Sequence, residues 1–453
     1  MRTDVGRSGG MFRRGRQTTE AGPVGHELLQ QRSPNSERLR SGPPATVAVS
    51  VLGIDADGLP RGATELLAGA KVVLGSWAHL EAHAPEGARR IELAQPGTAQ
   101  FDQAIGDLGE LSEEDGPAVI ITSGDPGFFG IMRALRERGV RTGKVLPGVS
   151  SVQRLLAKLG RSWDDVLVVS ARGRDLRRAL NVCRARPAVA VLTDAVAGPA
   201  EIGAGLTGWR RTLIVAEDLD TPDERISVVD PPKAAKRRWR DPNVVLCLAD
   251  PEAVPPRDWC AGGDPTPPAG GWGLPEESFA HRDGTVSKAE VRALALAKLA
   301  PRPGSLVWDV GSGAGALAIE CARLGAAVIA VEPNPVQCMR IIANAATHGV
   351  DMRIVENEAP AALVGLPRPD SIFVGGGGPE VVAACAAVGA ERVVVALTAL
   401  DRLGASRDAL RHSGYVVDGC QLSANRLATM SDGASRFVGT TPTLILWGRR
   451  KTS

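Results

Sequence analysis

Residues 251–275 constrain the fold of this chain more than any other segment, because they interrupt every continuous helix or central strand. The segment reads PEAVPPRDWCAGGDPTPPAGGWGLP and is dense in proline and glycine. Proline removes a backbone donor and fixes φ, and proline–glycine clusters mark loops. Strand-length apolar runs alternate with helical segments on both sides. We therefore expect two domains in series, 46–250 and 276–450, joined by a linker at 251–275.

Both halves show the alternation that is typical of α/β domains, which is the fold class that we predict. In the first half we expect strands at 47–54, 71–75, 118–122, 166–170, 188–192, 212–216 and 244–248. In the second half we expect them at 306–310, 327–331, 352–355, 371–374, 392–397, 415–420 and 443–447. A helix is predicted at 287–300, with Ser287 as its N-cap and Glu290 at capping-box spacing.

Residues 1–45 are rich in Arg, Ser, Gly and Pro and lack apolar periodicity. They have no continuous apolar core of a secretory signal, and acidic residues such as Glu20 oppose a transit peptide. We predict a disordered tail, or an over-long start with Met11 as a rival initiator.

Charge and cysteine usage exclude several classes of partner. The formal net charge is +2, which gives no general attraction to nucleic acid, and the apolar runs are too short to span a membrane. In the basic run KAAKRRWR (233–240), an exposed loop is favoured over a nucleic-acid stripe. The seven cysteines are dispersed, without CxxC or metal-spaced histidines, so we expect reduced thiols in a cytoplasmic protein and no metal site.

The stretch VWDVGSGAG (307–315) predicts a ligand-binding turn. Asp309 lies at the end of a strand. The turn that follows contains Gly311, Gly313 and Gly315, and a helix comes after it. Such a turn lets a nucleotide-like ligand approach the main chain. The following strand ends in Glu332, where a carboxylate can hold both ribose hydroxyls. The GxGxG spacing favours S-adenosylmethionine (SAM) over a dinucleotide, which would require GxGxxG.

Later residues extend the same site and narrow its substrate. Glu358 follows the third strand of this half, where groups near an adenine usually lie. After the fourth strand, DSIFVGGGGPE (370–380) lacks the Asn/Asp-Pro-Pro-aromatic sequence of enzymes that methylate amino groups of nucleic acids. No Pro-Cys nucleophile is nearby. A nucleic-acid base is therefore disfavoured, and the glycines from Gly375 onward leave room for a bulky substrate.

The first half has two glycine turns at strand ends. In TSGDPGFFG (122–130), Gly124 and Asp125 begin an exposed turn. In PGVSSVQ (147–153), Ser151 lies where a helix begins. Each alone predicts a loop, and together they predict a second ligand site.

These motifs together resemble a known family. The first half is similar to the CbiE-like tetrapyrrole (corrin/porphyrin) methylases in VLGIDADGLPRGATELLAGAKVVLGS (51–76), SGDPGFFG (123–130) and LPGVSSVQRLLAKLG (146–160). The second half is similar to CbiT-like methyltransferases in GLPEESFAHRDGTVSKAEVRALALAKL (273–299), VWDVGSGAG, AVEPNP (330–335), ENEAPAAL (356–363) and IFVGGGGPE (372–380). This order resembles the CobL family of precorrin-6Y C5,15-methyltransferases (decarboxylating). Asp55 departs from the family, which commonly has glycine at its position.

The resemblance implies a two-lobed tetrapyrrole methylase domain followed by a doubly wound, Rossmann-like class I SAM methyltransferase domain. The enzyme would use SAM to methylate the C5 and C15 meso carbons of a precorrin and would decarboxylate the ring C acetate, in cobalamin (vitamin B12) biosynthesis. The second domain would carry the decarboxylation and one methylation, and the first domain the other. Family members often form homo-oligomers.

A substrate with many carboxylates requires cations and a proton donor. We therefore expect catalytic roles for His281, Lys288 and Arg426, with Arg282 and Asp283 near them. Two alternatives stay open. One is a single-site SAM enzyme whose first half only binds tetrapyrrole, and the other is a non-catalytic tetrapyrrole-binding protein.

Overall fold

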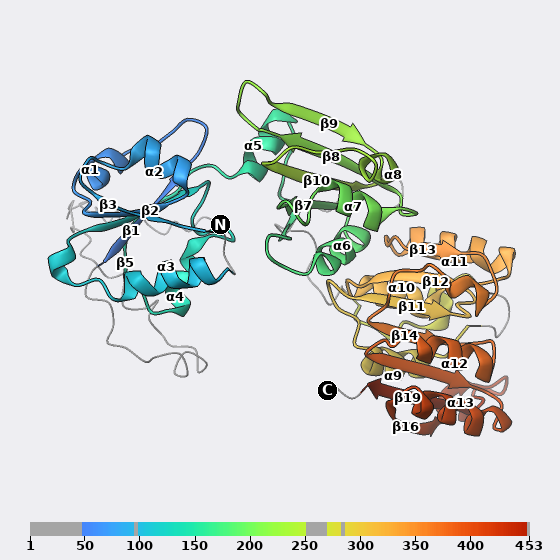
Figure 1. Ribbon diagram of the computed structural model, residues 1–453. Coiled ribbons are helices and arrows are strands. Elements are labelled where there is room, and N and C mark those ends of the chain that lie inside the picture. Colours follow the sequence, from blue (N-terminus) through green and yellow to red (C-terminus); the bar gives the residue numbers. More distant parts are fainter. Residues whose placement is uncertain (1–47, 95–97, 251–269, 282–285, 451–453) are drawn as a thin grey trace, which may run out of the picture.

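The computed structural model describes residues 48–94, 98–250, 270–281 and 286–450 (Figure 1). The described residues confirm the α/β class, with helices packed against three large sheets. The predicted tail at 1–45 lies outside the described residues, as do Cys260, Arg282, Asp283 and most of the predicted linker. No described helix has both the length and the apolar content to cross a membrane.

The first lobe, residues 48–146, is a parallel sheet in the order β3-β2-β4-β1-β5. Its strands are β1 (Val49–Ile54), β2 (Val72–Gly75), β3 (Arg89–Glu92), β4 (Ala118–Ser123) and β5 (Thr142–Leu146). Its helices are α1 (Ala63–Ala68), α2 (Trp77–His83), α3 (Ala99–Gly109) and α4 (Ile131–Glu137). The central strands β1 and β4 are apolar on both faces, as a parallel sheet between two helix layers requires.

The second lobe, residues 147–250, is a mixed sheet in the order β6-β7-β10-β8-β9. Its strands are β6 (Leu167–Ser170), β7 (Ala188–Leu192), β8 (Arg211–Glu217), β9 (Arg225–Val229) and β10 (Asn243–Ala249). Its helices are α5 (Ser151–Lys158), α6 (Leu176–Ala185), α7 (Pro199–Leu206) and α8 (Pro231–Ala234). The basic run 233–240 lies between β9 and β10, and two of its arginines, Arg237 and Arg240, contact the fully buried carboxylate of Glu217.

The C-terminal domain is a doubly wound sheet in the order β13-β12-β11-β14-β15-β19-β16, with β19 antiparallel to both neighbours. Its strands are β11 (Leu306–Val310), β12 (Ala327–Val331), β13 (Arg353–Val355), β14 (Ser371–Val374), β15 (Arg392–Leu397), β16 (Tyr415–Leu422) and β19 (Thr443–Arg450). Its helices are α9 (Ala289–Leu299), α10 (Ala316–Arg323), α11 (Pro335–Thr347), α12 (Pro379–Ala387) and α13 (Asp401–His412).

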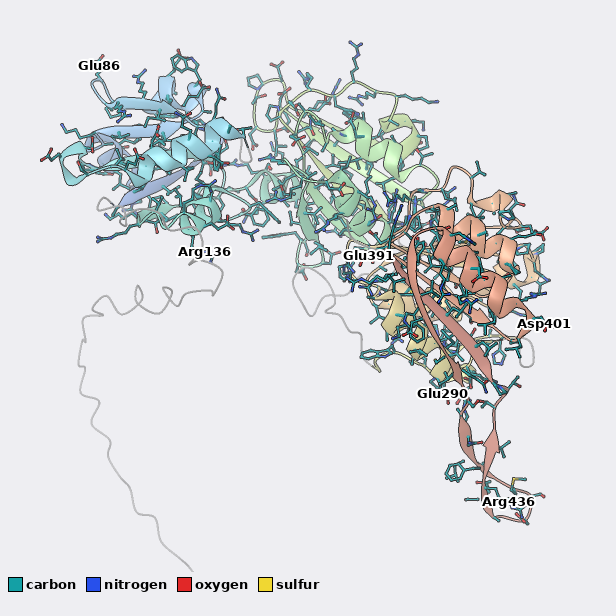
Figure 2. The ribbon with its side chains drawn as sticks, turned by 60° about the horizontal axis from the view of Figure 1, so that its bottom comes forward. Glu86, Arg136, Glu290, Glu391, Asp401 and Arg436 are labelled. Carbon is teal, nitrogen blue, oxygen red and sulfur yellow. The ribbon has the colours of Figure 1, made fainter. Side chains whose placement is uncertain are left out.

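A two-stranded hairpin, β17 (Asn425–Thr429) and β18 (Ser435–Gly439), projects from the C-terminal domain with Arg436 toward its tip (Figure 2). The sequence pattern did not predict it, nor β3, β5 and β9. These strands carry charged or exposed residues along much of their length, so their apolar alternation is weak.

The helix predicted at 287–300 is present, but the prediction that Ser287 is its N-cap is wrong. Helix α9 begins at Ala289, its N-cap residue is Lys288, and no side chain caps it in Ser287's place. The backbone N–H of Ala289 instead donates to Glu276 Oε1 at 2.7 Å. A carboxylate from a distant turn has replaced the local cap.

The second lobe packs against the C-terminal domain (Figure 1). Trp209, just before β8, belongs to the same buried cluster as Leu306 of β11. Arg211 Nη1 lies 2.6 Å from Asp351 Oδ2, and both side chains are buried. Asn181 Nδ2 on α6 donates to Gly304 O at 3.0 Å. The two halves therefore share apolar and polar contacts.

Candidate functional site

The glycine turn after β11 has the backbone that its sequence predicts. Gly311, Gly313 and Gly315 have φ of 73°, 57° and 80°, in the left-handed region that favours glycine. A Cβ on Gly311 would lie 2.8 Å from Gly376 N, so the turn also contacts the glycine-rich loop after β14. Both loops lie at the carboxyl ends of parallel strands, the edge at which doubly wound sheets bind ligands.

The carboxylate of Asp309 fixes this turn through hydrogen bonds. It is 1% exposed, and its Oδ2 accepts hydrogen bonds from Ser312 Oγ at 2.7 Å and Ala318 N at 3.1 Å. Burial raises the pKa of Asp309 to about 6, and the charge of Glu332 adds to this. Its buried Oδ1 has no hydrogen-bond partner among the described residues. A buried carboxylate oxygen without a partner is expensive, which favours a donor on a bound ligand.

The structure brings Glu332 to the same turn. Its Oε2 accepts a hydrogen bond from Gly313 N at 2.8 Å, and its Oε1 accepts one from Asn334 N at 3.0 Å. The acid that the sequence pairs with the turn therefore contacts its middle glycine.

Glu358 is exposed beyond β13, and a second acid, Glu356, directly follows Val355, whose carbonyl accepts a hydrogen bond from Glu332 N at 3.1 Å. The charges of Glu356 and Glu332 add to burial in raising the pKa of the Cys338 thiol, and this thiol donates to Glu332 O at 3.3 Å. Sequence reasoning missed Glu356, although it stands two positions before Glu358 in the same motif.

His281 is connected to the glycine turn through Asn344, which is 3% exposed on α11. Asn344 Oδ1 accepts from Ala280 N at 2.7 Å, and its Nδ2 donates to Ala280 O at 3.0 Å and to Ala314 O at 2.9 Å. The amide therefore bonds both the residue before His281 and a residue inside the glycine turn. His281 Nδ1 lies 2.8 Å from Phe279 O, which leaves Nε2 for other contacts.

Arg426, for which a catalytic role was predicted, pairs with two carboxylates of the chain. At the base of the hairpin, its guanidinium is 2.9 Å from Glu276 Oε1 through Nη2 and 2.9 Å from Glu290 Oε1 through Nε. This hydrogen bonding lowers the pKa of Glu276 to about 2. Glu290 is labelled beside the base of the hairpin in Figure 2. Two carboxylates of the chain thus accept the hydrogen bonds of the Arg426 guanidinium. Lys288, which lies between Glu276 and Glu290 in the sequence, is half-buried.

In the first lobe, three loops meet at the carboxyl ends of β1, β4 and β5. Gly124 has φ of 67°, and its N–H donates to Ile54 O at 2.6 Å. A Cβ on Gly53 would lie 2.0 Å from Gly124 O. Asp125 Oδ1 accepts from Gly127 N at 2.8 Å and so fixes the turn. Ser151 begins α5, but the capping hydroxyl belongs to Ser150.

Asp55 connects the two lobes. Its Oδ2 accepts from Val149 N at 2.6 Å, and its Oδ1 is 3.0 Å from Arg154 Nη2 on α5 of the second lobe. Burial opposes ionisation, yet the backbone hydrogen bonds and Arg154 lower the pKa of Asp55. Arg154 also pairs with Asp57 and Asp220. Sequence reasoning had no means to find this ion-pair network.

Comparison with known proteins gives two family matches. The model for tetrapyrrole (corrin/porphyrin) methylases matches residues 48–231, and that for the precorrin methyltransferase domain matches residues 277–423. The chain is 34% identical over 354 residues to a precorrin-6Y C(5,15)-methyltransferase (decarboxylating) from Sinorhizobium sp, covering 74% of this chain and 81% of the relative.

Two further relatives are similar. The same enzyme from Mycobacterium tuberculosis is 32% identical over 282 residues, or 61% of this chain and 68% of the relative. A probable cobalt-precorrin-6B C(15)-methyltransferase (decarboxylating) from Pyrobaculum calidifontis is 35% identical over 164 residues, or 34% of this chain and 84% of the relative.

Proposed function

Because the chain belongs to the family of precorrin-6Y C(5,15)-methyltransferases (decarboxylating), we propose that it methylates C5 and C15 of a precorrin with SAM at two sites. The same enzyme would remove the ring C acetate carboxyl as CO2, in cobalamin biosynthesis. We assign the tetrapyrrole methylase domain to 46–250 and the SAM methyltransferase/decarboxylase domain to 276–450. The Pyrobaculum calidifontis relative, similar over 164 residues, is named for C15 methylation and decarboxylation together, which supports both steps in one domain.

One observation carries the proposal: the middle one of the three left-handed glycines of the β11 turn bonds the Glu332 carboxylate, and buried Asp309 Oδ1 has no partner within the part of the chain that the structure describes. These residues fit SAM. The turn would admit its adenosine, Glu332 would accept hydrogen bonds from the ribose hydroxyls, and Glu358 would lie toward the adenine. When bound, SAM supplies an electrophilic sulfonium methyl group.

The chain's own task is then to orient the substrate and exclude water. An electron-rich meso carbon is already nucleophilic, so no Ser, Cys or Lys nucleophile is required. The protein must hold that carbon in line with the methyl group. The macrocycle would lie over the loop Gly375 to Gly378, which packs against the glycine turn.

Decarboxylation requires a proton donor near the reacting carbon. The acetate C–C bond breaks, CO2 leaves, and the electron pair enters the conjugated macrocycle until a proton is delivered to carbon. We assign that proton delivery to His281, because Asn344 holds its segment against the glycine turn. Lys288 would bind a peripheral carboxylate of the substrate. Arg426 would order the segment through Glu276 and Glu290.

We assign the second SAM site to Gly124, Asp125 and Ser151. The left-handed φ of Gly124 and the hydrogen bond from Gly127 N to Asp125 support this, because they set the turn at the carboxyl end of a parallel strand, where such sheets bind ligands. The ion pair between Asp55 and Arg154 would fix the two lobes around it.

We also propose a homo-oligomer in the cytoplasm. The hairpin carries a cross-strand pair, Leu427 and Phe437, whose exposed fractions are 66% and 74%, and exposed apolar pairs favour association. The described cysteines are free thiols, which suits a reducing compartment. Light scattering on the purified chain would test the oligomer, and a monomeric mass would reject it.

Titration calorimetry with SAM tests the two-site assignment. The parent protein should bind two equivalents, and Glu332→Ala should bind one, at the N-terminal site. One equivalent in the parent would favour the single-site alternative, and none would favour a non-catalytic binder. Unchanged binding of both equivalents by Glu332→Ala would reject the ribose placement. The mass of the product made from the precorrin should show two added methyl groups and the loss of one CO2.

A further inference from the structure

A pocket lies beside the glycine turn of the C-terminal domain, where β14 and β15 end. Its floor is apolar and includes Val374, Val382 and Val395, and one wall is formed by the loop that begins at Gly375. The other side is formed by the residues that lead into α13, among them Arg402. The pocket therefore combines an apolar base with a single cationic side chain.

The pocket shares a wall with the glycine turn. Gly375 N donates to Val310 O at 2.8 Å, and a Cβ added at Gly311 would lie only 2.8 Å from Gly376 N. A group held in the pocket would consequently lie next to a ligand on the turn. This proximity connects the pocket to the reaction assigned to this half.

Arg402 is the unpaired cation of this region. Among the described residues its guanidinium makes no ion pair, whereas Arg407 on the same helix pairs with Asp408 at 3.0 Å and Arg426 is held by two glutamates. Its Nη1 would be 3.9 Å from a Cβ added at Gly378, so it faces the glycine-rich wall. The start of α13 is labelled at Asp401 in Figure 2.

The size of the pocket indicates what it would hold. It encloses about 70 Å³, well below the roughly 300 Å³ at which sites begin to enclose a whole small molecule. A tetrapyrrole macrocycle exceeds this space, but one of its carboxylate side chains does not. Arginine binds a carboxylate through two parallel N–H donors, and the exposed side chain of Arg402 leaves its donors accessible.

We propose that Arg402 binds one peripheral carboxylate of the tetrapyrrole in this pocket and so contributes to substrate affinity and selection beside the glycine turn. This inference rests on the proposed function of the C-terminal domain. The bound carboxylate is distinct from the one lost as CO2, because a tight ion pair with arginine stabilises a carboxylate and slows its decarboxylation. Arg402 is thus a specificity-determining residue.

Release of CO2 from the precorrin tests the inference, since it reports the C-terminal domain alone. Arg402→Gln should raise KM for the precorrin about 10- to 100-fold and leave kcat within about 3-fold, because the lost interaction is equal in ground and transition states. SAM affinity should not change. Arg402→Lys should restore part of KM, since it keeps the charge and loses the paired donors.

Arg407→Gln is the matched control, because it removes an arginine from the same helix whose partner is on the surface. It should leave KM unchanged. An unchanged KM in Arg402→Gln would overturn the assignment, and so would a loss of SAM affinity, which would place the carboxylate of SAM itself in the pocket. A parent enzyme that releases no CO2 would overturn the proposed function and this inference with it.

Discussion

Replacing Asn344 by alanine removes the connection between the His281 segment and the glycine turn. The side-chain amide makes three hydrogen bonds, of 2.7, 3.0 and 2.9 Å, in a place where it is 3% exposed. Each such bond contributes about 0.5–1.5 kcal/mol net, and their loss leaves Ala280 N–H, Ala280 O and Ala314 O without partners. We therefore expect Asn344→Ala to lower the free energy of unfolding by about 2–4 kcal/mol.

The functional effect should exceed what lost stability explains. At a temperature where the variant is still folded, His281 is no longer held beside the turn. We expect CO2 release to fall by about 10- to 100-fold in kcat, while SAM affinity falls by less than about 5-fold, because misplacing a reacting group by about 1 Å has this scale of effect. Urea unfolding, titration calorimetry and CO2 release measure the three quantities.

Asn181→Ala is the matched control for this prediction. Asn181 is 1% exposed, and its amide donates to Gly304 O and accepts from Arg184, so its loss has a similar cost. Gly304 lies at the amino end of β11, away from the glycine turn. Asn181→Ala should lose stability and keep its kcat. If Asn344→Ala retained full CO2 release despite its lower stability, Asn344 would not position His281.

Three further variants test the electrostatic assignments. Asp351→Asn should lower the free energy of unfolding by about 3–5 kcal/mol in urea, since it leaves buried Arg211 unpaired; no change would show that the pair is not closed. Because the pKa of Asp309 is raised to about 6, the parent should lose about 3 kcal/mol relative to Asp309→Asn as pH rises from about 4 to 6, and a constant difference would contradict the raised pKa. Because the pKa of Glu276 is lowered to about 2, the stability from its contact with Arg426 should be present above about pH 4.5 and lost toward pH 2. Glu276→Gln should remove this dependence and increase proteolysis of the hairpin, and equal cleavage of both proteins would refute the anchoring.

The sequence could predict those features that depend on neighbouring residues. The central strands are short runs of apolar residues buried on both faces, such as Leu306–Val310 and Ala327–Val331. A short apolar run between turn residues is typical of a buried strand. The glycine turn was predictable for the same reason, since alternate glycines directly after a strand permit the left-handed φ values that are found. The position of Glu332 at the end of the next strand was predictable from the regular length of one strand–helix–strand unit, whereas its hydrogen bond with Gly313 came from the structure.

Partners that are distant in sequence could not be predicted. Arg426 was selected as a substrate-binding cation because its charge was evident, but the glutamates that occupy it lie 150 and 136 positions away. Asn344 gave no pattern at all, because its role depends on which loops fold above α11. The expected cap at Ser287 failed for the same reason, since Glu276 supplies the acceptor instead.

Three polar contacts between the two halves lie at one edge of the C-terminal sheet. Gly304 precedes β11, Asp351 precedes β13 and Asp370 precedes β14, and these residues bind Asn181, Arg211 and Arg177 of the second lobe. All three strands are parallel, so these residues mark the amino-terminal edge, whereas the glycine turn and the Arg402 pocket lie at the carboxyl-terminal edge. The second lobe can therefore be bound permanently without covering the ligand edge. It follows that interface variants such as Asp351→Asn should change the stability of the protein and leave the kcat of CO2 release intact.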